Sequence, residues 1–371
     1  FYAQVLLSMP NDSRQIPTTH IGSLPRPPEL LDLLKRRQDG EQVDEQEWAE
    51  TVREATETVV RRQVDAGIDI ANGGEQPRVS FNWYVKNRLS GIEGTETTAL
   101  WADLQDYPEY ADETFTTDVL DLSEHPVVTG PLEYTGREEA ETELAVFEDA
   151  LDATGATFDD TFVTSASPSV VTATHVDEHY GDYEEYLFAA ADAMQTEYGL
   201  LAEAGYTLQI DAPELLTVGQ TDAYADASLE EIKQASRLHV EALNDALENV
   251  PAEQVRLHTC WGSYEGPGHR DTDLAEMLPI LYEADITGLS VEQANHRHQH
   301  EYRAFAEHPV PDGWTLIPGV VDVKTNIIDH PETIADRLER AQADVESLLT
   351  ELPDEDFRVA VERLQRTAAE R

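Results

Sequence analysis

Short apolar segments alternate with longer amphipathic segments along most of this chain. In the longer segments apolar residues recur at helical spacing: Val52, Val59 and Val60 share one face of residues 45–66, and Gly67 follows as a stop signal. The predicted helices are 30–37, 45–66, 183–205, 228–247, 274–284 and 331–349. The short segments are rich in apolar residues and end at turn-forming or polar residues, a pattern typical of buried strands. The predicted strands are 18–23, 68–72, 161–165, 207–211, 255–262, 288–292, 315–321 and 357–361.

Strands that alternate with helices in this way predict an α/β fold, a (β/α)8 TIM barrel. An open, doubly wound sheet is the alternative, but such a sheet carries a glycine-rich phosphate loop after its first strand, and the sequence has none there. No linker or internal repeat divides the 371 residues. We therefore expect a single catalytic barrel at 18–371 and an N-terminal extension at 1–17, with Met9 as the natural start. An irregular insertion between strands two and three, at about 80–135, is expected to contain one strand at 126–129.

The charge of the chain narrows the classes of partner. It contains 75 Asp and Glu residues against 25 Lys and Arg residues, a formal net charge of −50. Nucleic acids and anionic membranes are bound by cationic surfaces, so neither is an expected partner. Acidic residues spread over every helix are typical of proteins from salt-loving organisms, in which high salt screens the repulsion. One cysteine cannot form an intramolecular disulfide, and we expect a cytoplasmic protein.

His258 and Cys260 should leave the same face of the strand predicted at 255–262, because strand residues two positions apart point the same way. Cys260 is the only cysteine in the sequence. A cysteine sulfur and a histidine nitrogen suit zinc, which needs one or two further ligands. Glu292, at the end of the next predicted strand, is the candidate third ligand. The chemical alternative is a nucleophilic Cys–His pair, which would need an oxyanion hole that the sequence does not indicate.

Polar residues end most of the predicted strands. They are Ser23, Glu75, Asp211, His258, Cys260, Glu292 and Asp322. Barrel enzymes hold their active sites at the rim formed by the carboxyl ends of the strands, so these residues are predicted to share one site. Taken singly, Asp211 could be a helix N-cap and Glu75 a surface acid. The histidine-rich segment 295–301 is interpreted as a pocket-lining or solvated loop in preference to a second zinc site.

Six short motifs, in this order, resemble the catalytic domain of the cobalamin-independent methionine synthase family. They are TTHIGS (18–23), GE (74–75), QID (209–211), HTC (258–260), SVE (290–292) and PGVVD (318–322). The resemblance extends from residue 18 to residue 335. Residues 22–27 and 257–263 resemble the single-domain branch of the family, which lacks an N-terminal duplicate barrel.

The resemblance implies a zinc-dependent methyltransferase that methylates the thiol of homocysteine. It implies zinc at His258, Cys260 and Glu292, and we count Asp322 with His258 and Cys260 as catalytic. The positions implied for binding the amino acid are Ile21, Gly22, Ser23, Glu75 and Asp211. Two carboxylates can pair with an α-ammonium group, and backbone N–H groups of a turn can bind an α-carboxylate. Zinc lowers the pKa of a coordinated thiol, so that the thiol reacts as thiolate at neutral pH.

The sequence departs from the family pattern in three ways. The family's second zinc cysteine, expected just after strand eight, is absent from the sequence. One explanation is that water or substrate fills the fourth coordination position of the zinc ion. The other is that a loop carrying the cysteine is missing between Val361 and Glu362. The family's histidine after the PGVVD strand aligns with Lys324. No folate-contacting motif is found, so a methyl-pterin and a methylated corrinoid protein both remain candidate methyl donors. Alkyl transfer to another small thiol, and a non-catalytic barrel that binds an amino acid or thiol, are the alternative functions.

Overall fold

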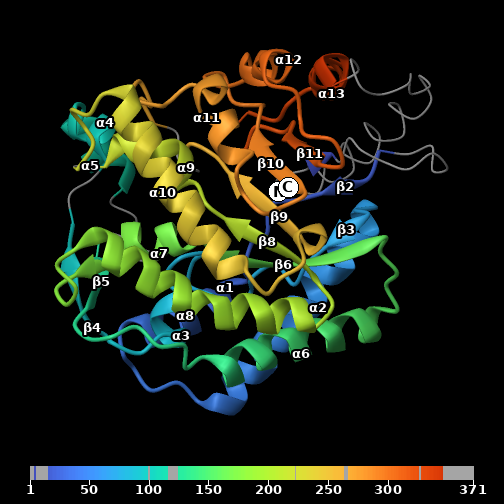
Figure 1. Ribbon diagram of the computed structural model, residues 1–371. Helices are drawn as coiled ribbons and strands as arrows, with labels where there is room; N and C mark the ends of the chain where they lie inside the picture. Colours follow the sequence, from blue (N-terminus) through green and yellow to red (C-terminus); the bar gives the residue numbers. More distant parts are fainter. Residues whose placement is uncertain are drawn as a thin grey trace.

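The computed structural model describes residues 4–5, 16–98, 101–115, 124–221, 223–262, 266–325 and 327–345. Its central element is a curled sheet of parallel strands (Figure 1). Parallel pairing runs without interruption through β3 (Ile70–Ala71), β6 (Asp160–Ala166), β8 (Thr207–Asp211), β9 (Val255–Thr259), β10 (Gly288–Glu292) and β11 (Thr315–Gly319).

The two ends of this sheet approach each other. β2 (Thr18–Thr19) lies against β3, because the Asp69 backbone N–H donates to the Thr18 carbonyl at 3.1 Å and the Thr18 N–H donates to Asp69 Oδ2 at 2.7 Å. On the other side, β1 (Gln4–Val5) pairs antiparallel with both β2 and β11. The fold is therefore of the (β/α)8 barrel type, as the alternation of elements predicted.

Helices cover the outside of the curled sheet (Figure 1). The longer ones are α1 (Pro28–Gln38), α2 (Glu45–Ala66), α6 (Arg137–Thr154), α8 (Tyr183–Glu203), α10 (Leu229–Leu247), α11 (Leu274–Leu281) and α13 (Pro331–Val345). Short helical turns lie between the strands and the longer helices: α7 (Pro168–Thr174), α9 (Glu214–Thr217), α12 (Ala304–Glu307), and the 3-10 turns Val218–Gln220, Ala252–Gln254 and Glu301–Arg303. None of the helices within the described ranges is long and apolar enough to cross a membrane.

Local sequence signals fix the ends of several helices. The Asp44 side chain accepts hydrogen bonds from the backbone N–H groups of Gln46 and Glu47 at the start of α2, and Gly67 ends that helix at φ 70°. Ser228 and Glu231 form a capping box at the start of α10. These helices consequently begin and end within a residue of the boundaries predicted from sequence.

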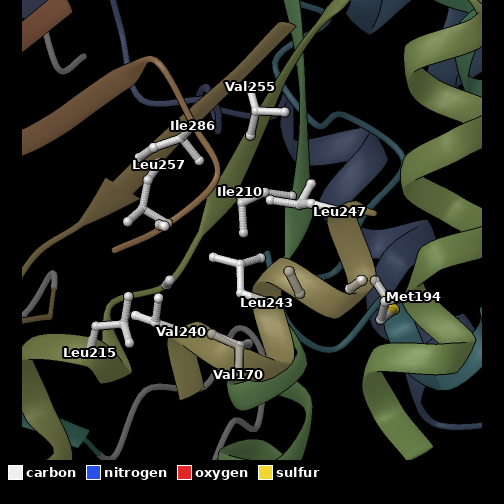
Figure 2. Close-up of a cluster of buried hydrophobic side chains, with 14 of the residues drawn as sticks. Val170, Met194, Ile210, Leu215, Val240, Leu243, Leu247, Val255, Leu257 and Ile286 are labelled. Carbon is white, nitrogen blue, oxygen red and sulfur yellow. The ribbon is translucent and has the colours of Figure 1, made fainter. Parts of the chain in front are cut away.

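Side chains alternate between the two faces of each strand, and the outward face carries the main hydrophobic core. Ile210, Val255 and Leu257 point from β8 and β9 toward α10, where Leu243 and Leu247 contact them (Figure 2). All of these side chains are at least nine-tenths buried. The alternate positions on the same strands face the barrel interior, so the polar residues there are separated from the apolar core by the strands themselves.

The segment between β3 and β6 is more regular than expected. It contains α3 (Val85–Arg88), β4 (Ile92–Thr97), α4 (Ala102–Gln105), α5 (Pro108–Phe115) and β5 (Glu124–Val128). β4 and β5 pair antiparallel, and β5 pairs in parallel with β7 (Val176–Asp177) in a separate small sheet. The expectation of an irregular segment was therefore wrong, because β4 finds its partner in the strand that was expected at 126–129.

Other boundaries differ from the predictions. β2 is shorter than the strand expected at 18–23, and β3 is shorter than the one expected at 68–72. The strand expected at 357–361 and the loop proposed after Val361 lie outside the described residues. In the sheet order, β1 lies between β11 and β2, where an eighth barrel strand would stand.

Candidate active site

The strands β8, β9 and β10 are neighbours in the sheet, so their carboxyl ends lie at one region of the barrel rim (Figure 1). Asp211 is in register with His258, and His258 with Ser290, across neighbouring parallel strands. Cys260 and Glu292 stand two residues farther along the same two strands. Since each of these positions lies on the inward phase of its strand, the side chains converge on the barrel interior.

The barrel interior also contains a buried cation, Arg256, which lies two residues before His258 on β9. Arg256 Nε donates to Gln209 Oε1 at 2.9 Å, and the guanidinium carbon lies 3.7 Å from the centre of the Phe162 ring. Burial lowers the pKa of Arg256 to about 9, although attraction to Asp160 and Asp211 opposes this shift. The guanidinium is therefore stabilised by an amide oxygen and an aromatic face in place of a directly paired carboxylate.

Glu75 and Asp211 form a buried acidic pair beside this cation. Thr164 Oγ1 donates to Glu75 Oε1 at 2.7 Å, and Gln209 Nε2 donates to Asp211 Oδ1 at 2.8 Å. Burial and then the charge of Glu75 raise the pKa of Asp211 well above its usual range. Glu75 Oε2 is buried and accepts no hydrogen bond from any described residue. The pair therefore has unused capacity to bind a cationic group.

The backbone near Glu75 is held in uncommon conformations. Gly22 has φ +146°, and a Cβ atom there would lie 2.6 Å from Glu75 Oε1 and 2.8 Å from Thr164 Cγ2. Glu75 itself has φ 53°, in the left-handed region, and Arg26 Nη2 donates to its carbonyl at 2.6 Å. Such strain is typical of functional sites, and only glycine permits this close approach at position 22.

The turn of Ile21, Gly22 and Ser23 lies against the acidic pair. Gln209 Nε2, which holds Asp211, also donates to the Ile21 carbonyl. The Gly22 N–H donates to His20 Nδ1 at 3.3 Å, so this N–H is already engaged. Ser23 is exposed at the rim. The Ser23 hydroxyl accepts a hydrogen bond from Arg26 Nη1 at 3.3 Å.

His258 and Cys260 are both buried, with 4% and 8% of their surface exposed. Burial, assisted by the charges of Arg256 and Lys324, lowers the pKa of His258 to about 3, so its imidazole is neutral. His258 Nδ1 lies 3.3 Å from Ser290 Oγ, a hydrogen bond that fixes the ring and directs Nε2 away from Ser290. Burial raises the pKa of Cys260 to about 12. In this environment Cys260 is a thiol unless a bound cation stabilises the thiolate.

Glu292 is paired with a lysine. Lys324 Nζ lies 2.6 Å from Glu292 Oε2, and both side chains are more than nine-tenths buried. The distance is that of a close ion pair. Burial raises the pKa of Glu292, and the charge of Lys324 opposes that shift. Gly319 lies against the backbone of Glu292, and a Cβ atom at position 319 would lie 3.2 Å from Glu292 Cα.

Asp322 organises the turn that carries Lys324. The backbone N–H of Lys324 donates to Asp322 Oδ1 at 3.0 Å, and Thr325 Oγ1 donates to Oδ2 at 3.3 Å. Asn295 Nδ2 donates to Oδ1 at 3.4 Å, and the Asp322 N–H donates to Asp329 Oδ2 at 3.0 Å. Asp322 is thus engaged with the turn and its neighbours, and these contacts are those of a positioning residue.

The donor types of the site fit zinc, but their arrangement is incomplete. His258 offers a neutral imidazole, Cys260 a sulfur, and Glu292 a carboxylate oxygen without a hydrogen bond. Within the described ranges, no group of three or more His, Cys, Asp and Glu side chains is arranged to hold a metal ion. Glu292 is instead directed to Lys324.

A pocket of about 510 Å³ opens over this region. Its lining includes Trp261, Asp271, Asn295, His296, Arg297, His298, Lys324 and Ile327. Residues from three loops therefore meet beside the ion pair of Lys324 and Glu292, and the histidine-rich segment is one of them.

Within the histidine-rich segment 295–301, the ring of His298 contacts three side chains. Its ring stacks on Trp261 at 3.6 Å between centroids, and its Nδ1 and Nε2 lie 2.8 Å from Glu301 Oε1 and 2.9 Å from Asp271 Oδ2. Burial by itself would lower the pKa of His298, but these two carboxylates raise it. His298 therefore joins the loops that form one wall of the pocket.

The structure gathers most of the residues that the sequence singled out. Ile21, Gly22, Glu75 and Asp211 lie together, His258 is in register with Asp211, and Glu292 pairs with Lys324. Sequence reasoning missed the roles of Thr164, Gln209 and Arg256. The period-2 alternation could have identified Gln209 and Arg256, because each lies two residues before a predicted site residue on its strand.

The sequence is similar to those of known methionine synthases. Residues 16–112 match the family model described as "Cobalamin-independent synthase, Catalytic domain". A methionine synthase of Thermococcus kodakarensis is 25% identical over 333 residues, which are 89% of this chain and 83% of that protein. A methionine synthase of Sulfolobus acidocaldarius is 22% identical over 327 residues, covering 88% of this chain and 80% of the relative.

Solved structures share the fold. A B12-independent methionine synthase from Shewanella sp. W3-18-1, in complex with selenomethionine, superposes with a TM-score of 0.65 at 21% identity, over 94% of this chain and 95% of that one. A putative vitamin-B12 independent methionine synthase from Listeria monocytogenes gives a TM-score of 0.62 at 18% identity, over 95% and 96%. The family model and the relatives support the resemblance of this chain to the cobalamin-independent methionine synthase family that the motifs indicated, and the solved structures share its fold.

Proposed function

We propose that this protein transfers a methyl group to the thiol of homocysteine and so forms methionine. The observation that carries the proposal is the buried acidic pair of Glu75 and Asp211, with its unused capacity for a cation, next to His258 and Cys260. An amino acid with a side-chain thiol matches both halves of the site. The relatives named methionine synthase support the same substrate.

The acidic pair would bind the α-ammonium group of homocysteine. Two carboxylates that share a buried space repel each other, and an ammonium group between them removes that repulsion. Gln209 and Thr164 hold the two carboxylates in place through their hydrogen bonds. Ser23, at the exposed end of the adjoining turn, is the proposed contact for the α-carboxylate.

His258, Cys260 and Glu292 would hold a zinc ion, with the substrate thiol as a further ligand. When bound, zinc would stabilise a thiolate at neutral pH and so supply the nucleophile. The residues of the chain prepare this chemistry. Ser290 fixes the ring of His258, burial keeps that imidazole neutral, and the side chain of Cys260 is itself buried.

The methyl donor would approach through the pocket lined by Trp261, Arg297 and Lys324. The methyl carbon would form a bond to the homocysteine sulfur as its bond to the donor breaks, and the donor would leave with that electron pair. A methyl-pterin and a methylated corrinoid protein both satisfy this balance, and the choice between them is a matter for direct assay.

The test is methionine formation from homocysteine by the zinc-loaded protein, with a methyl-pterin and with methylcobalamin in parallel. The proposal expects turnover with one donor and loss of at least ~10-fold in kcat/KM in Asp211→Asn, since a charge-assisted hydrogen bond contributes ~1.5–3 kcal/mol. Turnover of a thiol that lacks the α-ammonium, such as 2-mercaptoethanol, at an equal rate would favour the other-thiol alternative. Homocysteine binding without turnover with either donor would favour the non-catalytic barrel.

A further inference from the structure

Glu292 is paired with a cation of the protein itself, the ammonium group of Lys324. Lys324 Nζ lies 2.6 Å from Glu292 Oε2, with 6% and 7% of the two side chains exposed. The ammonium group therefore lies directly beside one of the three proposed zinc donors.

The backbone of Lys324 is anchored in its turn, and its side chain is held by the ion pair with Glu292. Asp322 accepts hydrogen bonds from the Lys324 N–H and from Thr325, which fixes the turn. Lys324 also lines the open pocket of about 510 Å³, so its four-carbon side chain has space into which it can turn.

We infer that Lys324 is a displaceable internal cation, which occupies the place of the metal beside Glu292 and must turn into the pocket before Glu292 can bind zinc. This inference rests on the zinc site proposed above. In the metal-free protein, the ion pair prevents Glu292 from remaining as an unpaired buried charge, which is strongly destabilising. The same pair competes with zinc and so weakens its binding.

Displacement is distinguishable from simple repulsion between a lysine and a metal ion. Repulsion weakens zinc binding whether or not position 292 carries a carboxylate. Displacement requires Glu292, because the competition is for its oxygen atoms. A double-mutant cycle over positions 324 and 292 therefore separates the two explanations.

The experiment measures zinc affinity of the purified protein by competition with a chromogenic chelator. It compares the wild type with Lys324→Met, Glu292→Gln and the double variant. Lys324→Gln serves as a second neutral variant. Lys233→Met, at a lysine that pairs with Glu276 on the helical surface, is the matched control for loss of a lysine charge. Cobalt(II) provides an independent readout, since its thiolate charge-transfer absorption reports coordination by Cys260.

The expected result is tighter zinc binding by on the order of 10-fold in Lys324→Met, a change of the size seen when groups beside metal ligands are altered. No gain is expected in the Glu292→Gln background or in Lys233→Met. An unchanged or weaker affinity in both neutral variants, or a gain that persists without Glu292, overturns the inference while leaving the zinc site intact. Absence of zinc binding and of a cobalt–thiolate signal in all variants overturns the proposed zinc site as well.

Discussion

Asp211 illustrates how one residue can serve ligand binding at the expense of stability. Its carboxylate is buried next to Glu75, and burial and that neighbouring charge raise its pKa in the folded protein. An acid with a raised folded-state pKa contributes stability below its unfolded pKa of ~3.9, and this contribution is lost as pH rises through the folded value. At neutral pH, ionised Asp211 therefore costs stability unless a cation is bound.

The substitution Asp211→Asn should stabilise the free protein at pH 7.5 while weakening homocysteine binding by ~10-fold or more, because it removes the repulsion together with a charged partner of the ammonium group. Thermal unfolding and calorimetric titration measure the two effects. The stability gain should shrink as pH falls toward 5. A variant that is both less stable and equally tight in homocysteine binding would contradict the role of the pair.

Gly22 is the second residue whose substitution should change both stability and ligand binding. In Gly22→Ala the added methyl group would clash with Glu75 and Thr164 at a φ of +146°. We expect a loss of ~1–3 kcal/mol in the free energy of unfolding, from strain at a position where the backbone is not free to shift, and weaker homocysteine binding. The matched control is Gly155→Ala at the end of α6, where φ is also positive, at +60°. There the added Cβ atom would meet no neighbouring group within 4 Å. Equal effects of the two variants on binding would argue against a specific role for position 22.

At the scale of elements, His298 connects the loops that follow β9 and β10. Its raised pKa means that the charged ring contributes stability that is complete below the unfolded pKa of ~6.5 and is lost as pH rises through the folded value. His298→Gln should therefore destabilise the protein more at pH 6 than at pH 9. Denaturant unfolding of both proteins across this range measures the difference, and nuclear magnetic resonance titration of His298 reports its pKa directly. A difference in stability that does not change with pH would mean that only the packing on Trp261 matters.

At the scale of the whole molecule, the charge sets the conditions under which the fold is stable. With 75 acidic and 25 basic side chains, most carboxylates have no basic residue to pair with. The Debye length falls from ~10 Å at 0.1 M salt to ~3 Å at 1 M, so added salt should reduce this repulsion.

We therefore expect the midpoint of thermal unfolding to rise by several degrees between 0.1 M and 2 M KCl. Sucrose at matched osmolality is the control for effects of solute exclusion, which stabilise proteins irrespective of their charge. The rise in KCl should clearly exceed the rise in sucrose. A midpoint that falls or stays constant with KCl would contradict the interpretation of the acidic surface as an adaptation to salt.

The sequence by itself determined the order and type of most elements and the identity of the principal polar residues. Helices and buried strands have different apolar periods, and turn and capping residues such as Gly67 and Ser228 act locally, so both can be recognised without a fold. The same alternation placed His258 and Cys260 on one strand face. Parallel strands in a barrel present their carboxyl ends at one rim, which is why Asp211, His258 and Ser290 stand side by side on neighbouring strands.

Only the tertiary structure decided how those residues pair. Glu292 meets Lys324 across 32 positions of sequence, and Thr164 meets Glu75 across 89, so no local pattern could reveal either contact. The shape of the turn at Asp322 directs Lys324 inward, whereas sequence alone could only note a lysine in place of a histidine. The pairing of β4 with β5 depended in the same way on a partner distant in the chain. Register and turn geometry are set by the packed whole, because side-chain partners are chosen by burial and charge and not by sequence separation.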